Sequence, residues 1–424
     1  MRVVGIAAAA AVVLALGYAV LVSPGFEPYL DDQVSYLRLA NGLVERGEYT
    51  RAAQDAPFAP EPLRPPGYPL FLAPLCLFGC SHWTIAIMQA LLYGALVFLA
   101  YAIARRMLSV RAARFAAVAV ALYLPIAYFA AIAYSDFLAT FLLVAGSAAF
   151  LRARRTSSLA WGSAAGALFG WLALTRAVFV LFPAALAFVT LVVDGRRLFS
   201  PRALRPMLAA ALVFAIVLAP LMLYSARHFG RPFASSSGSA VWLGAVQGVG
   251  MADLDEFEAA ELAAVKSEVA AFDQITDRVD QAYAWTVLNE QLGVHGTRFI
   301  AHDPLGYLVR TPVRALVLWA GDLPVPVDTM PSLDASVRVL AGAVQIALFL
   351  FALVGAIALA RRRDDASLLP LVIILYVSAV ALLLGTEARY ALPAKPFVLI
   401  AACSGVALLV GRRPRDTTRA ASVP

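Results

Sequence analysis

Charged residues are scarce in this sequence: Asp, Glu, Lys and Arg make up only 14% of the 424 residues, whereas 62% are apolar. Soluble domains average about 25% charged residues, so this composition excludes an ordinary water-soluble fold. A helix needs about 20 predominantly apolar residues to cross a bilayer, and many such runs occur here, separated by arginines. We therefore expect an all-α polytopic membrane protein.

Cysteine and histidine are rare as well, with three cysteines (Cys76, Cys80, Cys403) and four histidines. The cysteines are too few, and lie in too apolar a setting, for a disulfide scaffold, so we interpret them as small hydrophobic residues. The histidines lack the spacing of metal ligands, which argues against a zinc site. The sequence has no Gly-rich phosphate loop and no GxSxG motif, so it predicts neither a nucleotide site nor a serine hydrolase.

Hydropathy predicts ten membrane helices. They cover residues 3–23, 83–104, 114–132, 137–151, 158–174, 177–193, 207–226, 337–360, 367–385 and 393–411. The first apolar run is longer than the core of a signal peptide, so we expect it to remain as an uncleaved helix.

Charge provides an independent test of this topology, because short cytoplasmic connections collect Arg and Lys. With the N-terminus inside, the inner side holds 19 basic and 4 acidic residues, and the outer side holds 15 basic and 23 acidic residues. Both termini are therefore expected in the cytoplasm, and the basic surplus is an orientation signal that implies no nucleic-acid partner. The preference for Arg over Lys is typical of GC-rich bacteria, so we expect the bacterial cytoplasmic (inner) membrane.

This topology divides the chain into four regions. They are a transmembrane catalytic core at 1–226 with a first outer loop at 24–82, an outer, mostly soluble segment at 227–336, the last three membrane helices at 337–411, and a cytoplasmic tail at 412–424. In the first outer loop, the run "LFLAPLCLFG" is too short to span and predicts an interfacial helix. In the second segment, apolar residues recur every three to five positions over 254–283, which predicts an amphipathic helix or helix pair.

Several ionisable residues fall at the outer interface, where charge is costly. These are Asp31, Asp32, Arg64, Asp136, Arg176, Glu387 and Arg389. A charge within a membrane segment costs about 2.5–3.5 kcal/mol on insertion scales. For any single one of these residues, an interfacial charge in contact with water is the simpler explanation. Several ionisable residues at the same face of the membrane together indicate a functional site.

The adjacent pair Asp31 and Asp32 follows the first helix. Neighbours on a helix point about 100° apart, so one carboxylate can face a cavity while the other caps the following helix. A helix start with acids in its first turn is the purely structural explanation. As a functional site, such a carboxylate can take a proton from an acceptor hydroxyl, or hold a divalent cation through its oxygens. The cation is the one cofactor that the sequence leaves open.

Several motifs occur together in a defined order. They are the acidic pair with Tyr36 downstream, then "LRPPGYPLF", "WLALTRAVFVLFP" and "TEARYALPAKPF". As a set they resemble the GT-C superfamily of integral membrane glycosyltransferases, and within it the family 39 group of protein mannosyltransferases and aminoarabinose transferases. The resemblance implies a base at Asp31 and a lipid-phosphate contact at Arg389. The family often has Asp-Glu where this chain has Asp31-Asp32, and the shorter second side chain leaves its reach and any metal role open.

This resemblance implies transfer of a sugar from a polyprenyl-phosphate donor to a hydroxyl or lipid acceptor, which can be a protein, lipid or glycan, on the outer face of the membrane. Arg64 and Arg389 would hold the lipid phosphate, because a guanidinium forks onto phosphate oxygens. The other residues expected to contact substrate are Tyr36, Tyr68, Asp136, Arg176, Glu387 and Tyr390. The alternative is a transporter or flippase of lipid-linked or envelope precursors, which would place charges near mid-bilayer in two matched halves.

Overall fold

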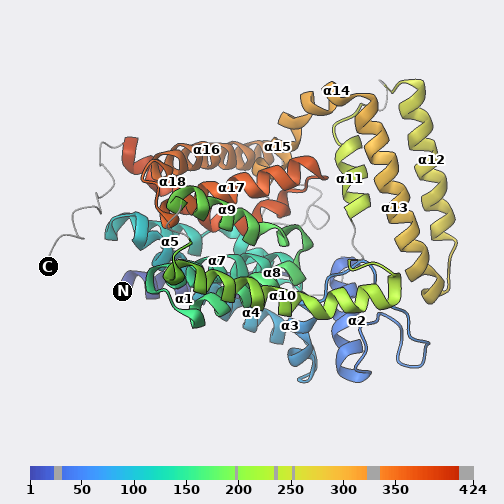
Figure 1. Cartoon of the computed structure of the whole chain (residues 1–424), viewed down its shortest axis with the longest axis horizontal. Coiled ribbons are helices and arrows are strands. Elements are labelled where there is room, and N and C mark those ends of the chain that lie inside the picture. Colours follow the sequence, from blue (N-terminus) through green and yellow to red (C-terminus); the bar gives the residue numbers. More distant parts are fainter. Residues whose placement is uncertain (23–30, 196–198, 234–236, 251–253, 322–334, 410–424) are drawn as a thin grey trace.

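The computed structural model of the chain is built from helices, and its described residues form no strand (Figure 1). The structure describes residues 1–22, 31–195, 199–233, 237–250, 254–321 and 335–409. Among these, eight helices are long and apolar enough to cross a membrane, and one bent pair can form a ninth span. The prediction of an all-α polytopic membrane protein is therefore confirmed.

Each of the ten predicted segments coincides with a helical element. The elements are α1 (Arg2–Val22), α4 (His82–Met107), α5 (Val110–Ala121) with α6 (Leu124–Ala131), α7 (Ser135–Thr156), α8 (Leu159–Thr175), η1 (Ala177–Phe179) with α9 (Phe182–Asp194), α10 (Pro201–Phe229), α16 (Ala335–Ala360), α17 (Asp365–Leu383), and η4 (Ala388–Ala394) with α18 (Lys395–Leu409). Helices α5 and α6 are bent by 46°. Pro125 lies in the first turn of α6, where its missing N–H costs no hydrogen bond.

Small residues allow α8 and α10 to pack closely. A Cβ at Gly162 would lie 2.3 Å from the carbonyl oxygen of Pro206, and one at Gly166 would lie 2.2 Å from that of Ala210. Glycines spaced four apart let two helix backbones approach, which is a common packing device in membranes. The contact continues towards Arg176, the residue after α8, because a Cβ at Gly170 would lie 2.8 Å from the Val217 side chain.

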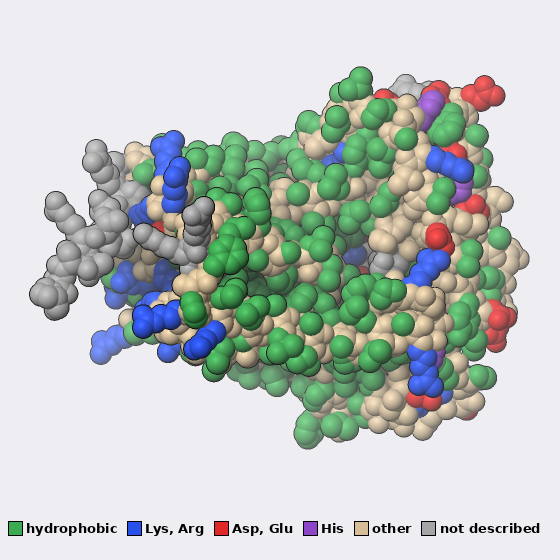
Figure 2. All heavy atoms as spheres, viewed as in Figure 1, with side chains coloured by type: hydrophobic (Ala, Val, Ile, Leu, Met, Phe, Trp, Pro, Cys, Tyr) green, Lys and Arg blue, Asp and Glu red, His purple; other side chains and the backbone are tan. Residues whose placement is uncertain are grey.

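The two ends of the bundle differ in charge (Figure 2). Lys and Arg side chains gather at the end where α1 begins and α18 ends, and Asp and Glu gather at the opposite end, near α12 and α13. This distribution is the one expected from the charge count along the sequence. The assignment of the basic end to the cytoplasm stays a prediction.

The remaining helices lie at or beyond the acidic end. They are α2 (Asp31–Glu45), α3 (Gly67–Cys76), α11 (Ser237–Val246), α12 (Glu256–Asp273), α13 (Arg278–His302), α14 (Pro304–Val309) and α15 (Thr311–Ala320). The run predicted as an interfacial helix contributes to α3, whose 10 residues are too short to span. The predicted amphipathic segment forms the pair α12 and α13, and α13 continues well beyond the predicted end at residue 283.

Cys76 and Cys80 form a disulfide, so their interpretation as small hydrophobic residues is wrong. Helix α3 ends at Cys76, and the chain then turns back through Gly79 and Cys80, which have φ angles of 95° and 48°. This reversal brings the two Cα atoms within 3.7 Å of each other. Spacing alone could not reveal it, because an i, i+4 pair on a continuous helix would not close in this way.

A histidine links the helices of the α12–α13 hairpin. His295 on α13 contacts the carboxylates of Glu261 and Glu268 on α12, one with each ring nitrogen. Burial lowers the pKa of this imidazole, but the hydrogen bonds to the two glutamates outweigh burial and raise the pKa above its ordinary value. When it is protonated, the ring can donate to both carboxylates and so link the two helices.

Candidate active site

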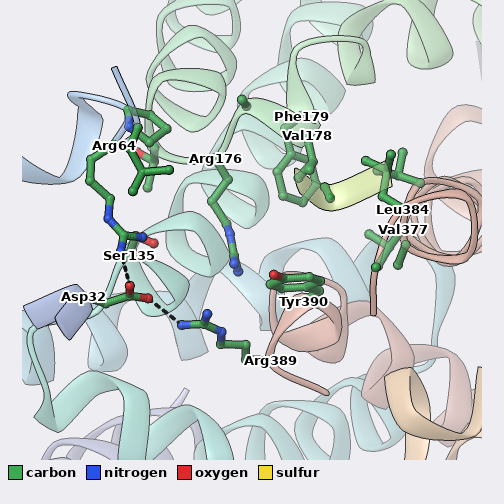
Figure 3. Close-up of a pocket in the computed structure, with 18 of the residues that line it drawn as sticks. Asp32, Arg64, Ser135, Arg176, Val178, Phe179, Val377, Leu384, Arg389 and Tyr390 are labelled. Carbon is green, nitrogen blue, oxygen red and sulfur yellow. Dashed lines mark hydrogen bonds and ion pairs between the residues drawn. The ribbon is translucent and has the colours of Figure 1, made fainter. Parts of the chain in front are cut away.

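A cavity of about 200 Å³ opens at the acidic end of the bundle. Its wall combines the first turns of α2, the strip at 63–65, the junction of α8 with η1 at 175–179, and the end of α17 with the turn before α18. Three arginines from three different segments line it: Arg64, Arg176 and Arg389 (Figure 3). A cluster of this kind favours a ligand that offers negatively charged oxygens.

Asp32 lies between two of these arginines (Figure 3). Its carboxylate forms an ion pair with Arg64 through one oxygen and accepts a hydrogen bond of 2.8 Å from Arg389 through the other. Burial raises the pKa of the Asp32 carboxyl, but the two guanidiniums outweigh burial and hold this pKa below its ordinary value. Asp32 is therefore an anion that keeps its partners in place.

Arg389 is fixed from both sides. Its Nε donates to Glu387 at 2.6 Å, while its Nη1 donates to Asp32. The Tyr390 hydroxyl also donates to Glu387, at 2.9 Å, so this carboxylate organises the turn between α17 and α18. The Arg389 guanidinium lies 5.4 Å from the Tyr134 ring centroid, within the range of a cation–π contact.

Arg176 is the residue after the last turn of α8, and it pairs with Asp136 in the first turn of α7. The Asp136 carboxylate is 1% exposed, so its charge depends on this partner. The Arg176 guanidinium lies 5.0 Å from the centroid of the Tyr390 ring. Asp136 therefore positions Arg176 without lining the cavity itself.

The predicted tyrosines differ in their access to the cavity. Tyr36 lines it, lies 5.6 Å from the Arg64 guanidinium, and donates a hydrogen bond of 3.2 Å to Ser135. Tyr68 is fully buried behind Tyr36, with 5.0 Å between the ring centroids, and donates to Gln89 at 3.2 Å. Tyr68 therefore supports Tyr36, and a direct contact between Tyr68 and substrate stays a prediction that this arrangement does not favour.

The cavity brings together most of the residues predicted from the sequence. Asp32, Tyr36, Arg64, Arg176, Arg389 and Tyr390 line it, and Asp136 and Glu387 hold two of its arginines. Asp31 begins α2, but its side chain lies outside the described residues. The expectation that Asp31 faces the cavity therefore stays a prediction.

Several residues that line the cavity were not predicted. They include Ser135, Phe179 and Tyr376, and the Tyr376 hydroxyl donates to the Val178 carbonyl oxygen. Ser135 belongs to the polar "YSD" that separates two apolar segments, which is a signal that could have identified it. Phe179 and Tyr376 stack with 6.0 Å between ring centroids, and nothing in an apolar run distinguishes them from lipid-facing residues.

A second, larger cavity adjoins the first. Its volume is about 350 Å³, and both cavities are lined by Leu63, Arg64 and Val178. The second cavity continues between the end of α8 and the helices α10 and α11, where its lining includes Leu218, Leu221 and Phe233. An apolar cavity bordered by α10 and α11 therefore adjoins the arginine cluster.

The sequence left open the binding of a divalent cation. Among the described side chains, no three His, Cys, Asp or Glu residues lie close enough together to hold a metal ion. Both carboxylate oxygens of Asp32 are occupied by arginines. Asp32 in this arrangement therefore does not fit the role of a metal ligand, since cations such as Mg²⁺ require free carboxylate oxygens.

Comparisons with known proteins agree with the features described above. A sequence profile of the dolichyl-phosphate-mannose-protein mannosyltransferase family matches residues 63–224, a region that includes Arg64, Asp136 and Arg176. A search of curated proteins finds no match.

Among solved structures, the apo form of the Archaeoglobus fulgidus oligosaccharyltransferase is similar to the chain, with a TM-score of 0.55 at 15% identity over 97% of this chain and 50% of that one. The same enzyme tethered with an acceptor peptide gives a TM-score of 0.56 at 16% identity, over 97% and 49% of the two chains. ArnT from Cupriavidus metallidurans bound to undecaprenyl phosphate gives 0.37 at 18% identity, over 95% and 78%.

These findings confirm the resemblance to GT-C glycosyltransferases that the sequence predicts. The chain shares the fold of the oligosaccharyltransferase and spans about half of its length.

Proposed function

We propose that this protein is a glycosyltransferase that moves a sugar from a polyprenyl-phosphate donor to a hydroxyl or lipid acceptor at the outer face of the cytoplasmic membrane. The observation that carries the proposal is the meeting of three arginines at one cavity that adjoins a second, mainly apolar cavity. A polyprenyl-phosphate sugar has a lipid tail, a phosphate and an anomeric carbon close together. The apolar cavity suits the first part of the tail, and the arginines suit the phosphate.

The arginines stabilise the leaving group in this mechanism. As the bond between the anomeric carbon and the phosphate oxygen breaks, negative charge grows on the phosphate, and positioned guanidiniums stabilise that charge. Arg389 contributes its Nη2, since its Nε and Nη1 already bind Glu387 and Asp32. Arg64 lines the same cavity and binds Asp32 through Nη2, so its other terminal nitrogen, Nη1, is the donor that it would offer to the phosphate.

Asp31 is the proposed base, and Asp32 is the residue that positions the arginines. The lowered pKa of the Asp32 carboxyl makes it a weak proton acceptor while both guanidiniums contact it. Asp31 precedes Asp32 by one residue at the start of α2, so it lies on a different face of the helix. In the proposed step, Asp31 takes the proton of the acceptor hydroxyl as its oxygen attacks the anomeric carbon opposite the phosphate, which inverts the configuration.

A donor-turnover assay tests this function. The purified chain is reconstituted in liposomes with a panel of polyprenyl-phosphate sugars, and release of polyprenyl phosphate is measured for the wild type, Asp31→Asn and Asp55→Asn. Asp55 is an exposed acid of the same outer loop that takes part in no ion pair among the described residues, so its substitution is the matched control. We expect Asp31→Asn to lower turnover by about 10²–10⁴-fold, the usual contribution of a general base.

Two outcomes would contradict the proposal at different levels. Turnover of Asp31→Asn near that of the wild type would remove Asp31 from the role of base. Movement of the intact lipid-linked sugar across the bilayer, with no release of polyprenyl phosphate for any donor, would instead favour a transporter.

A further inference from the structure

A third cavity, of about 180 Å³, lies between the first outer loop and the α12–α13 hairpin. We call it the seam pocket. It is lined by Arg51, Ala52, Ala59, Pro60, Glu61, Pro62 and Leu63 from the loop, and by Phe272, Arg278, Gln281, Ala282 and Trp285 from the hairpin. None of the residues predicted from the sequence to contact substrate lies in it.

One face of α13 forms the hairpin wall of the seam pocket. The residues of this face are spaced three, one and three positions apart, which places them on the same side of the helix. They are Arg278, Gln281, Ala282 and Trp285. The small side chain of Ala282 leaves space between the longer ones. Trp285 also packs against the apolar core of the hairpin and lies 5.7 Å from the Phe272 ring, so its indole is held in a fixed position.

The polar groups of the seam pocket offer more donors than acceptors. The Trp285 Nε1 is buried without a hydrogen-bond partner, and the Arg278 guanidinium has no ion pair within the described part of the chain. The Glu61 carboxylate is already occupied, because it pairs with Arg51 and accepts from the backbone N–H groups of Leu63 and Arg64, both at 2.9 Å. A buried indole N–H usually finds a partner, so the pocket suits a ligand rich in acceptor oxygens.

The seam pocket is connected to the candidate active site. It shares Glu61, Pro62 and Leu63 with the apolar cavity, and that cavity shares Leu63, Arg64 and Pro65 with the arginine-lined one. Glu61 and Arg64 are three residues apart, so their Cα atoms lie at most about 11 Å apart. The seam pocket therefore borders the candidate active site along residues 61–65.

We propose that the seam pocket binds a sugar ring of the acceptor, so that the acceptor is a glycan or a glycolipid. A pyranose ring has an apolar face for stacking on Trp285 and a rim of hydroxyl oxygens for the unpartnered donors. A cavity of about 150 Å³ holds a benzene ring, so at 180 Å³ the seam pocket has room for no more than one sugar ring. The use of this site in catalysis rests on the proposed glycosyltransferase function, whereas the binding of a saccharide does not.

Direct binding tests this proposal without any need for turnover. The full chain in lipid nanodiscs is titrated with maltotriose, N-acetylchitotriose, trigalacturonate and a Ser/Thr-rich peptide, with saturation-transfer NMR as the readout. Ala282→Leu fills the pocket, and Ala284→Leu adds the same side chain on another face of α13 as the matched control. We expect saturable binding of at least one saccharide, weakened tenfold or more by Ala282→Leu and changed less than twofold by Ala284→Leu.

Trp285→Phe provides a second variant in case Ala282→Leu disturbs the hairpin. Phenylalanine keeps an aromatic ring but lacks the indole N–H, so we expect saccharide binding to weaken about tenfold. Three outcomes would each overturn the proposal. They are the absence of saturable binding for every saccharide, saccharide binding that is unchanged in both pocket variants, and binding of the peptide alone. Donor hydrolysis to water, measured on the same samples, should stay at the wild-type rate in both variants. Absence of any polyprenyl-phosphate release in the wild type, with and without the saccharide that binds, would refute the glycosyltransferase function and leave saccharide binding as a separate result.

Discussion

Replacing Arg389 by lysine tests whether the candidate active site needs a guanidinium fork or only a positive charge. In the structure, Arg389 Nη1 donates to Asp32 at 2.8 Å (Figure 3), and Arg389 Nε donates to Glu387 at 2.6 Å, so the two acids bind different nitrogens of the same group. A lysine ammonium is a single point on a flexible stem and cannot reproduce this planar arrangement. We expect Arg389→Lys to lose the contact with one of the two acids.

The size of the effect on donor binding follows from the hydrogen bond that the positioned Nη2 of Arg389 would offer to the donor phosphate and that a displaced ammonium would lose. A hydrogen bond to a charged group contributes about 1.5–3 kcal/mol. The Arg389 side chain is 26% exposed, so we reduce this figure to about 1–2 kcal/mol for partial screening by water. Since about 1.4 kcal/mol corresponds to a factor of ten, the KM for the donor should rise about 5–30-fold. Loss of one positioned donor to the departing phosphate should also lower kcat, by up to about 10²-fold.

The measurement is the initial rate of polyprenyl-phosphate release at varied donor concentration in liposomes. Arg231→Lys is the matched control, because Arg231 forms an exposed ion pair with Glu290 and lines none of the three cavities described above. We expect the control to stay within twofold of the wild type in both constants. If Arg389→Lys also stayed within threefold in both, the reasoning would be refuted, since a point charge at this position would then be sufficient.

Three further predictions concern stability. Gly238→Ala should separate α11 from α13, because the added Cβ would lie 1.7 Å from a backbone oxygen of α13. The thermal unfolding temperature in detergent should therefore fall, and an unchanged temperature would contradict this contact. Asp136→Asn should cost about 3–5 kcal/mol, since it leaves Arg176 without its buried partner, and denaturant unfolding measures this loss. The His295 bridge has a raised pKa, so its stabilisation should be complete below pH of about 6.5 and lost as the pH rises through the raised value. The rate of proteolysis of the hairpin should rise as the pH increases through that range. In the His295→Gln variant this rate should not depend on pH.

The sequence predicts the helices because their signals are local. Apolar runs, the polar breaks at "YSD" and "LTR", and the arginines between segments all act over one or two turns, and each predicted span coincides with a helical element. The candidate site was partly predictable for the same reason, since a charge at a membrane interface is conspicuous wherever it occurs. Arg64, Arg176 and Arg389 were found in this way.

The pairing of these charges could not be predicted, because it depends on how distant helices pack. Asp32 and Arg389 are 357 positions apart and meet only when α2 and the turn before α18 reach the same end of the bundle. The burial of Tyr68 behind Tyr36 likewise depends on the packing of α3 against α2. The seam pocket depends on the contact between an outer loop and a hairpin, which no periodicity in either segment indicates.

The acids of the site have a structural role that precedes any chemistry. Three arginines without counter-ions at the rim of an apolar bundle would repel one another and would be costly to insert. Asp32, Asp136 and Glu387 each bind one or two of them, so the six groups together carry no net charge. A phosphate is then attracted by the guanidinium N–H groups that remain unpaired and not by an excess of positive charge. Substitution of any of these acids should therefore lower the yield of folded protein as well as its activity, and rates must be compared per folded molecule.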